Sequence, residues 1–344
     1  MMESHTTTAK PALADSFGRR ISYLRISVTD RCDLRCRYCM PEKMTFLPRH
    51  DLLSIDEIGD LAERFIARGI TKIRLTGGEP LVRKGIADLT QRIGRWIGAE
   101  GAGGGLDELT LTTNGTQLAR YAPALADAGI RRINVSLDSL DPDRFRDITR
   151  GGDLAAVLNG ITAARAAGIA IKINMVGLKD INADEIEPML RWCASEGHDL
   201  TLIETMPLGE IEEDRTDHYL PLDGVRRALE SRYTLTPLTL RTGGPARYAR
   251  VEELDVRIGF ITPLTNNFCD GCNRVRVTAT GRLYMCLGHD DRVDLRAALR
   301  EGDQQTIDDM VDRAMMLKPL RHNFEIGARN APAAVERHMS VTGG

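Results

Sequence analysis

Six of the seven cysteines in this chain of 344 residues occur in two triplets, and such soft thiolate ligands select zinc or iron–sulfur clusters. The triplets are Cys32, Cys36 and Cys39, spaced C-x3-C-x2-C, and Cys269, Cys272 and Cys286, spaced C-x2-C-x13-C. The seventh cysteine, Cys193, lies alone in a predicted helix, where we expect it to act as a small buried apolar residue.

The first triplet has no nearby fourth ligand. His50, eleven residues beyond Cys39, is the nearest candidate. A structural zinc site normally uses four protein ligands, whereas three thiolates suit a four-iron cluster with one iron open to a substrate. Arginines at 31, 35 and 37 would offset the negative charge of such a cluster. The first triplet therefore predicts an iron–sulfur cluster.

The second triplet allows two interpretations. With His289 it reads C-x2-C-x13-C-x2-H, which by spacing alone is a Cys3His zinc site. The presence of the first triplet, and Arg274 and Arg276 directly after Cys272, favour a second iron–sulfur cluster instead. In that interpretation His289 is a surface residue or a neighbour of the ligands.

Short β-type runs alternate with longer helical patterns from about residue 24, which is typical of βα units. The predicted strands are 24–28, 72–76, 108–112, 132–137, 169–175 and 200–205. Ser54 and Glu57 form a capping box before an amphipathic run over 58–66. Further helices are predicted over 153–167, 182–195, 222–231 and within 291–321, and the glycine run at 101–105 is predicted to be a flexible linker.

Polar and glycine-rich clusters follow or end four of the predicted strands, at 29–31, 76–80, 112–115 and 136–139. Active sites of parallel α/β folds form at the carboxyl ends of the strands. Turn formation alone could explain Gly and Asn in one such loop. Their repetition at one edge of four units predicts a shared site.

The composition excludes several classes of protein. The charge is nearly balanced, with 46 Lys and Arg against 49 Asp and Glu, so a dedicated nucleic-acid binder is not expected. No apolar run approaches the ~18 residues of a membrane span. The polar first 20 residues hold no signal-peptide core, and we expect a cytoplasmic protein.

Two motifs carry a resemblance to a known family. CDLRCRYC at 32–39 is similar to the cluster signature of the radical S-adenosylmethionine enzymes, and Gly77-Gly78-Glu79-Pro80 is similar to their second motif. The segment 259–288 and the terminal Gly343-Gly344 resemble the GTP 3′,8-cyclase family within that group. The resemblance covers roughly 17–344. It departs at Thr342, where the family usually has an apolar residue.

This resemblance implies the fold class and its divisions. It implies an α/β fold, an incomplete (βα)6 TIM-like barrel with a C-terminal α+β extension that carries a second iron–sulfur cluster. The expected divisions are a flexible extension (1–16), a radical S-adenosylmethionine partial barrel (17–206), an auxiliary-cluster domain (207–330) and a mobile tail (331–344) that ends in Gly-Gly.

The resemblance also implies the reaction. Two [4Fe-4S] clusters and S-adenosyl-L-methionine are the expected cofactors. One-electron cleavage gives a 5′-deoxyadenosyl radical, which takes hydrogen from the ribose 3′ carbon of GTP, and the new radical attacks C8 of guanine. The product is (8S)-3′,8-cyclo-7,8-dihydroguanosine 5′-triphosphate, the first step of molybdenum cofactor biosynthesis.

Residue roles follow from the resemblance position by position. Tyr38, Gly78, Ser136 and Met206 match the S-adenosylmethionine contacts, and Arg25, Arg74, Thr112, Lys172, Arg274 and Arg276 match the GTP contacts. Arg274, Arg276, Gly343 and Gly344 are the expected catalytic group. Thr113 is adjacent to Thr112 and is the alternative for that contact.

The expected partners are GTP, an electron donor that the sequence does not identify, and, functionally, the cyclic pyranopterin monophosphate synthase that consumes the product. No nucleic acid or membrane partner is expected, and a homodimer is one arrangement that the sequence allows. The sequence leaves two other functions open: a radical S-adenosylmethionine enzyme with an auxiliary cluster that modifies a peptide, and a non-enzymatic zinc-binding protein.

Overall fold

A curved β-sheet surrounded by helices organises the chain. The computed structural model describes residues 12–99, 104–240, 243–264, 269–322, 324–325 and 333–343. Its strands are β1 (Tyr23–Ser27), β2 (Lys72–Thr76), β3 (Glu108–Thr113), β4 (Arg132–Ser136), β5 (Ala170–Val176), β6 (Asp199–Ile203), β7 (Leu235–Leu238), β8 (Arg247–Val251), β9 (Val256–Ile261), β10 (Arg274–Val277), β11 (Arg282–Tyr284) and β12 (Arg292–Asp294).

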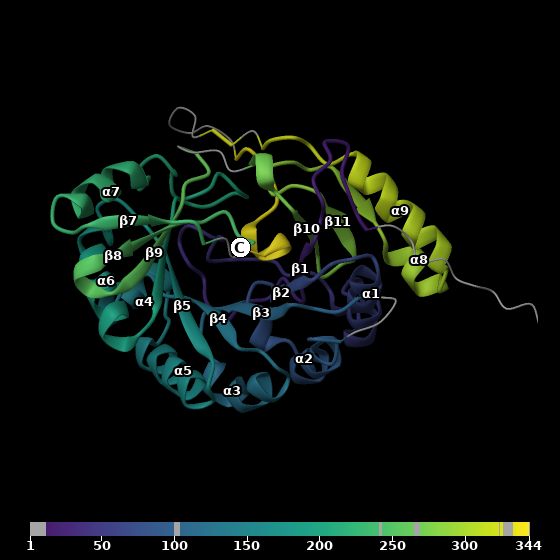
Figure 1. Cartoon of the computed structure of the whole chain (residues 1–344), viewed down its shortest axis with the longest axis horizontal. Helices are drawn as coiled ribbons and strands as arrows, with labels where there is room; N and C mark the ends of the chain where they lie inside the picture. Colours follow the sequence, from purple (N-terminus) through teal and green to yellow (C-terminus); the bar gives the residue numbers. More distant parts are fainter. Residues whose placement is uncertain are drawn as a thin grey trace, which may run out of the picture.

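The described strands form one sheet in the order β12-β11-β10-β1-β2-β3-β4-β5-β6-β9-β8-β7. Strands β10, β1 to β6 and β9 run parallel, and antiparallel strands extend both edges. Figure 1 shows the sheet as an open ring with helices along its outside. The predicted partial barrel is confirmed.

The helices are α1 (Ile55–Ala67), α2 (Ile86–Gly94), α3 (Leu118–Asp127), α4 (Pro142–Thr149), α5 (Leu154–Ala166), α6 (Ile186–Glu196), α7 (Leu222–Glu230), α8 (Arg296–Glu301), α9 (Gln304–Met316) and α10 (Met339–Thr342). The predicted capping box is present, because Ser54 Oγ accepts from the Glu57 N–H at 3.0 Å and Glu57 Oε2 accepts from the Ser54 N–H at 2.6 Å. These two bonds fix where α1 begins.

The predicted helix 182–195 begins too early. Asn182 does not cap α6, because its side-chain amide donates to the carbonyls of Asp138 and Val176, at 2.9 Å each. Residues Ala183–Glu185 form a 3-10 turn, and α6 starts at Ile186. Local pattern could not reveal this, since the amide is used by a neighbouring strand and loop.

The segment after β6 contributes to both edges of the barrel. Strand β9 lies parallel to β6, and β10 lies parallel to β1, with Arg276 opposite Arg25. The segments expected to form separate divisions therefore share one sheet. Apolar residues on the outer face of the strands, such as Ile133, Val135 and Ile173, are fully buried under the helices, so the inner face is left for polar side chains.

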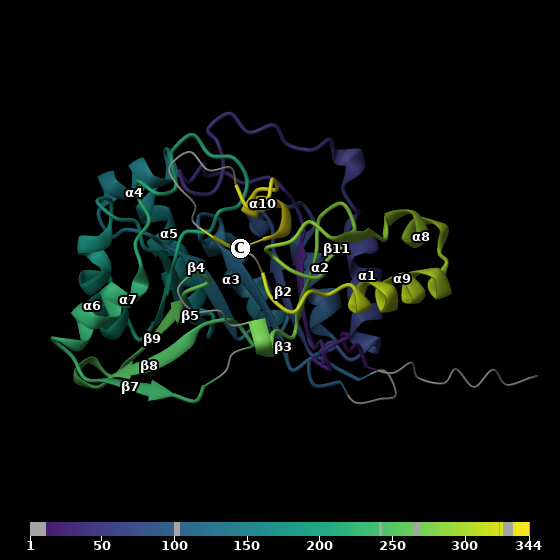
Figure 2. The same ribbon diagram turned by 90° about the horizontal axis from the view of Figure 1, so that it is seen from above.

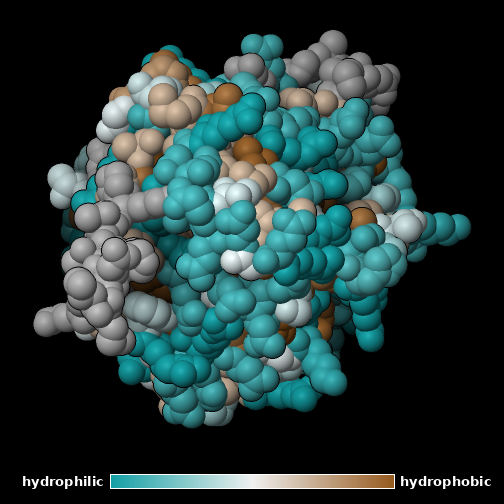
Figure 3. Space-filling model, turned by 90° about the vertical axis from the view of Figure 1, so that its right-hand side faces the viewer, coloured by the Kyte–Doolittle hydropathy of each residue, from teal (hydrophilic) through white to brown (hydrophobic). Residues whose placement is uncertain are grey.

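The face of the molecule that carries α8 and α9 is mostly hydrophilic, with small separate apolar areas (Figure 3). None of the helices in the described part of the chain has the length and apolar character needed to cross a lipid bilayer. Figure 2 shows α10 at the mouth of the ring, beside the loops that follow the strands.

The contact between α3 and α5 offers a test of the packing. A Cβ added at Gly160 would lie 2.5 Å from the carbonyl oxygen of Gly115, so we expect Gly160→Ala to lower the free energy of unfolding by about 1–3 kcal/mol. Gly224 in α7 has open space at its Cβ, and Gly224→Ala should be neutral or stabilise by up to about 1 kcal/mol. Chemical denaturation of both variants measures the difference. Equal changes in the free energy of unfolding of the two variants would contradict the close approach of Gly160 to Gly115.

Candidate active site

The first cysteine triplet lies in the loop after β1. Backbone bonds tie this loop to the glycine motif after β2: Gly78 N–H donates to the Thr29 carbonyl at 2.9 Å, and Glu79 N–H donates to the Arg31 carbonyl at 2.8 Å. A Cβ at position 78 would lie 2.4 Å from the Arg31 oxygen, so only glycine permits this approach. The two motifs found in the sequence are thus a single structural unit.

The cysteines of this triplet are half-buried. Burial raises the pKa of Cys32 and of Cys39 to about 12, and it raises that of Cys36 well above its usual value. Cys32 Sγ accepts from the Leu34 N–H at 3.4 Å and from the side-chain amide of Asn114 at 3.8 Å. Thiols held in this way ionise when they bind metal, so cluster loading must release protons.

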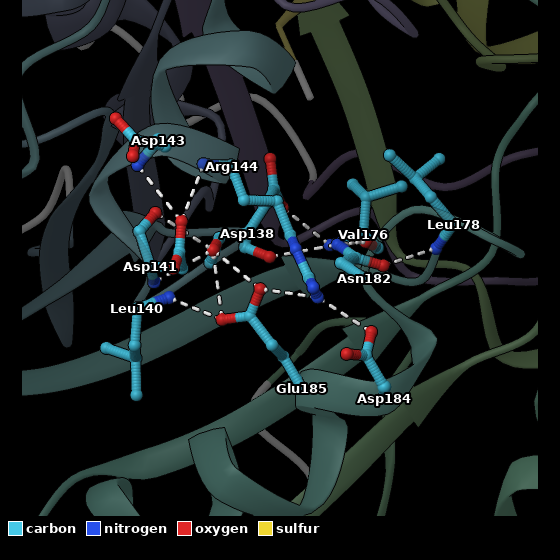
Figure 4. Close-up of polar contacts among 11 residues, drawn as sticks. Asp138, Leu140, Asp141, Asp143, Arg144, Val176, Leu178, Asn182, Asp184 and Glu185 are labelled. Carbon is cyan, nitrogen blue, oxygen red and sulfur yellow. Dashed lines mark hydrogen bonds and ion pairs between the residues drawn. The ribbon is translucent and has the colours of Figure 1, made fainter.

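Asp138 fixes the position of Tyr38 within the triplet loop. The Tyr38 hydroxyl donates to Asp138 Oδ2 at 2.6 Å, and Val176 N–H donates to Asp138 Oδ1 at 2.8 Å. Burial raises the pKa of Asp138 to about 6. Figure 4 shows that the surrounding loop is held in turn by Asn182 and by Glu185, which accepts from the Leu140 N–H at 2.8 Å. A network between the β4–α4 and β5–α6 loops therefore supports the cluster loop.

Glu79 joins the loops after β2 and β3. Its carboxylate accepts from the Leu81 N–H at 2.8 Å, the Thr113 hydroxyl at 2.8 Å and the Asn114 N–H at 2.6 Å. The side chain is fully buried, and burial raises the pKa of Glu79 to about 7 despite these donors. The two neighbouring threonines of β3 therefore have different partners. Thr113 donates to Glu79, whereas Thr112 Oγ1 accepts from Arg74 at 3.4 Å.

Three arginines stand beside one another inside the barrel. Strand register places Arg276 opposite Arg25, and Arg25 opposite Arg74, on β10, β1 and β2. We call these residues the arginine row. Their exposed fractions are 6%, 6% and 8%, and their Nε atoms have no hydrogen-bond partner among the described residues. Burial and then the neighbouring arginines keep the pKa of Arg25 well below its ordinary value.

Lys172 projects from β5 into the same space. Its ammonium group contacts the hydroxyl of Tyr248 from β8, and the side chain is 5% exposed. Burial, followed by repulsion from Arg74, lowers the pKa of Lys172 to about 7. Unlike the arginines, this residue can change its charge near neutral pH.

One cavity collects these cations and the second triplet. It holds about 940 Å³ of empty space, open solvent at its mouth included. Its lining includes Arg25, Arg74, Lys172, Met206, Cys269, Cys272, Arg274, Arg276 and Cys286. Buried positive charge is costly unless an opposite charge lies close to it, so the cavity fits an anionic ligand.

The two triplets lie at opposite ends of the barrel. Strands β1 and β10 are parallel neighbours; the first triplet follows the end of β1, whereas Cys272 precedes the start of β10. Burial opposes ionisation of Cys272, but Arg274 and then Lys318 outweigh it and lower the thiol's pKa to about 6. The cavity thus connects the second triplet to the arginine row.

The Cys3His interpretation finds no support in the arrangement. His289 Nε2 contacts the Arg321 carbonyl at 2.9 Å. Among the described residues, no three His, Cys, Asp or Glu side chains converge as a single metal ion requires. A cluster with one thiolate on each of three irons does not need such convergence, so both triplets remain suited to clusters.

The carboxyl-terminal α10 enters the barrel mouth, where Figure 1 places it at the centre of the ring. Ser340 N–H donates to the Cys39 thiol, and Ser340 and Thr342 are 1% and 0% exposed. A Cβ at Gly343 would lie 1.8 Å from Thr76 Oγ1, so this position accepts only glycine. The predicted catalytic residue Gly344 lies outside the described residues.

The remaining predicted residues have definite places. Met206 lines the cavity, Ser136 pairs in register with Asn174 at the end of β4, and Tyr38 faces a smaller pocket with Thr205. The sequence placed Asp138 within the polar cluster 136–139 but gave it no role of its own. Tyr248 and Lys318 were missed, because both act through long-range contacts.

The buried carboxyl of Glu79 gives a pH-dependent test. Its pKa is raised from 4.5 to about 7, so it stabilises the fold fully at low pH and that contribution is lost as pH rises through 7. Glu79→Gln removes the titrating carboxyl group, so we expect the change in the free energy of unfolding with pH to differ from that of the parent chain by up to about 3 kcal/mol. Relative to the parent chain, the variant should therefore become more stable between pH 5 and pH 8 in denaturation experiments.

Thr113→Val is the matched control, because it removes one donor to Glu79 and keeps the carboxyl group. This control should retain the pH dependence. An unchanged pH slope in Glu79→Gln would contradict the assignment of the raised pKa.

Comparisons with known proteins agree with this geometry. Residues 26–193 match the radical SAM superfamily, and residues 198–324 match the family described as Molybdenum Cofactor Synthesis C. The chain is similar in fold to Streptococcus suis SuiB bound to S-adenosylmethionine, with a TM-score of 0.59 and 16% identity over 85% of this chain and 68% of that one.

Full-length relatives are much closer in sequence. GTP 3′,8-cyclase of Erythrobacter litoralis is 61% identical over 98% of this chain and 100% of its own length. GTP 3′,8-cyclase of Rhizobium meliloti is 59% identical over 98% of this chain and 96% of its own. The chain belongs to the GTP 3′,8-cyclase family of the radical S-adenosylmethionine superfamily.

Proposed function

We propose that this chain cyclises GTP to (8S)-3′,8-cyclo-7,8-dihydroguanosine 5′-triphosphate, the first step of molybdenum cofactor biosynthesis. The observation that carries the proposal is the arginine row, which lies in one cavity with Lys172 and Arg274. A triphosphate is a polyanion, and guanidinium groups bind its oxygens with directed, charge-assisted hydrogen bonds. Relatives that share this chain's full length carry the same activity in their names.

The first triplet is the proposed site of a four-iron cluster and S-adenosylmethionine. When bound there, they supply a carbon radical that can remove a hydrogen atom from the substrate ribose. Tyr38, Gly78, Ser136 and Met206 are the proposed contacts for S-adenosylmethionine. Glu79 and Asp138 hold the motif loops in place through the hydrogen bonds described above, so the reacting groups meet in a fixed geometry.

The cavity cations orient the nucleotide. Arg25, Arg74, Thr112, Lys172, Arg274 and Arg276 are the proposed GTP contacts, and Arg274, Arg276, Gly343 and Gly344 are the proposed catalytic group. The buried α10 covers the mouth of the barrel and reduces the access of water. Exclusion of water protects reactive intermediates from side reactions.

Cys269, Cys272 and Cys286 are the proposed ligands of a second four-iron cluster. We assign radical generation to 17–206, the second cluster to 207–330 and closure of the site to 331–344, with 1–16 as an extension. The proposal includes an external one-electron donor and, in the same pathway, a cyclic pyranopterin monophosphate synthase that consumes the product. A cytoplasmic location and a homodimer are further predictions.

The decisive experiment is anaerobic reconstitution with iron and sulfide, followed by incubation with dithionite, S-adenosylmethionine and GTP. We expect 5′-deoxyadenosine and a cyclised nucleotide to form together. Cys36→Ala should abolish both products, because it removes a proposed cluster ligand. The control Cys193→Ala alters a buried cysteine of α6 outside both triplets and should retain activity. Formation of 5′-deoxyadenosine without consumption of GTP would refute the proposed substrate.

The lowered pKa of Lys172 leads us to expect that the protein takes up protons when GTP binds. Its pKa in the free chain is lowered to about 7, so at pH 8 the amine is mostly neutral. A polyanion beside it favours the ammonium form, and binding at pH 8 should take up to about one proton from solution. Calorimetry in two buffers of different ionisation enthalpy measures this number, and Lys172→Met should remove most of it.

The exposed Lys179 provides the control for this measurement. Lys179→Met should bind GTP with the same proton uptake as the parent chain. Equal uptake by the parent and Lys172→Met would show that another group titrates.

A further inference from the structure

A buried lysine after α9 contacts the second triplet. The Lys318 side chain is 2% exposed, and its ammonium group donates to the carbonyls of Arg274 at 2.9 Å and Met285 at 2.6 Å. A third contact joins the same nitrogen to Cys272 Sγ at 3.6 Å, within the range of a hydrogen bond to sulfur. All three contacts are to the second triplet or its close neighbours: Cys272 itself, Arg274 two residues after it, and Met285 directly before Cys286.

The charge of Lys318 is attracted to sulfurs of the second triplet, first that of Cys272 and then that of Cys286. Two of the three acceptors are neutral carbonyls, and only the Cys272 thiol can become an anion. Burying an ammonium group is costly unless an opposite charge lies close to it. The site therefore favours negative charge on the Cys272 sulfur and on whatever the sulfur binds.

The segment that carries Lys318 is anchored to the triplet at a second point. The His322 N–H donates to the Cys269 thiol. Arg19 binds the carbonyls of Pro319 at 2.7 Å and Leu320 at 2.9 Å, and the same guanidinium binds the Cys269 carbonyl at 2.8 Å. Residues 318–322 thus place one side-chain donor and one backbone donor against two different cysteine sulfurs.

We infer that Lys318 is a positioning residue which, through Cys272, raises the reduction potential of the second cluster. This inference rests on the second cluster of the proposed function. Reduction adds negative charge to an iron–sulfur cluster, and nearby cations and hydrogen bonds to sulfur stabilise the reduced state.

The test requires the second cluster alone. In a background of Cys32→Ala, Cys36→Ala and Cys39→Ala, iron and sulfide are measured, and the midpoint potential is determined by an anaerobic titration followed by electron paramagnetic resonance. Lys318→Gln keeps an amide that can donate to the Arg274 and Met285 carbonyls but removes the charge. We expect it to shift the one-electron equilibrium at least tenfold toward the oxidised cluster, which is about 59 mV.

Lys318→Arg keeps the charge and should stay closer to the background chain. Lys318→Gln could instead lose iron while its metal-free chain melts at the same temperature as the metal-free background chain. If Lys318→Arg keeps its iron, this result would also support the need for a cation beside the second cluster. Equal behaviour of the Gln and Arg variants, in potential or in loss of iron, would overturn the inference. A background chain without iron would overturn the second cluster itself, whereas a cluster with the same potential in every variant would overturn the role of Lys318 alone.

Discussion

Repulsion within the arginine row is the constraint on which the rest of the structure depends. Neighbouring strands lie about 4.8 Å apart, so Arg276, Arg25 and Arg74 are held close together and away from bulk water. Such an arrangement opposes folding unless another interaction holds the strands in place. The apolar outer face of the same strands supplies that interaction, because its residues are buried beneath the surrounding helices. The fold therefore maintains a concentration of positive charge that an anionic ligand would relieve.

The same strand pairing determines where the two cysteine triplets lie. Because β10 runs parallel to β1, a ligand loop after β1 and a ligand loop before β10 must be at opposite ends of the barrel. The arginine row occupies the strands between them. A nucleotide bound to the row would lie between the two proposed clusters, with α10 at the mouth beside the first triplet. The positions of both proposed clusters and of the proposed substrate site thus follow from one parallel register.

Much of this arrangement could be predicted from the sequence. The strands β1 to β6 lie within two residues of their expected positions, because each carries a local apolar pattern. The placement of β9 and β10 at the barrel edges could not be predicted, since no local pattern records which strand a distant segment will join. The hydrogen bond from Thr113 to Glu79 could not be predicted either, because it joins two segments that are distant in the sequence. The start of α6 at Ile186 could not be predicted either, because the Asn182 amide binds the carbonyls of Asp138 and Val176, which are distant or non-helical partners.

The distribution of lysine and arginine adds a final physical distinction. The chain has 46 Lys and Arg, of which only seven are Lys, yet Lys172 and Lys318 are both deeply buried at the site. Arginine keeps its charge under all ordinary conditions and offers a planar fork suited to phosphate oxygens. Lysine offers a compact charge that fits beside a sulfur atom and can be given up when no anion is near. In the proposed function, the arginine row therefore attracts the triphosphate. Lys172 is then a cation whose charge changes when the ligand binds, and Lys318 is a compact cation that fits beside the sulfur of Cys272.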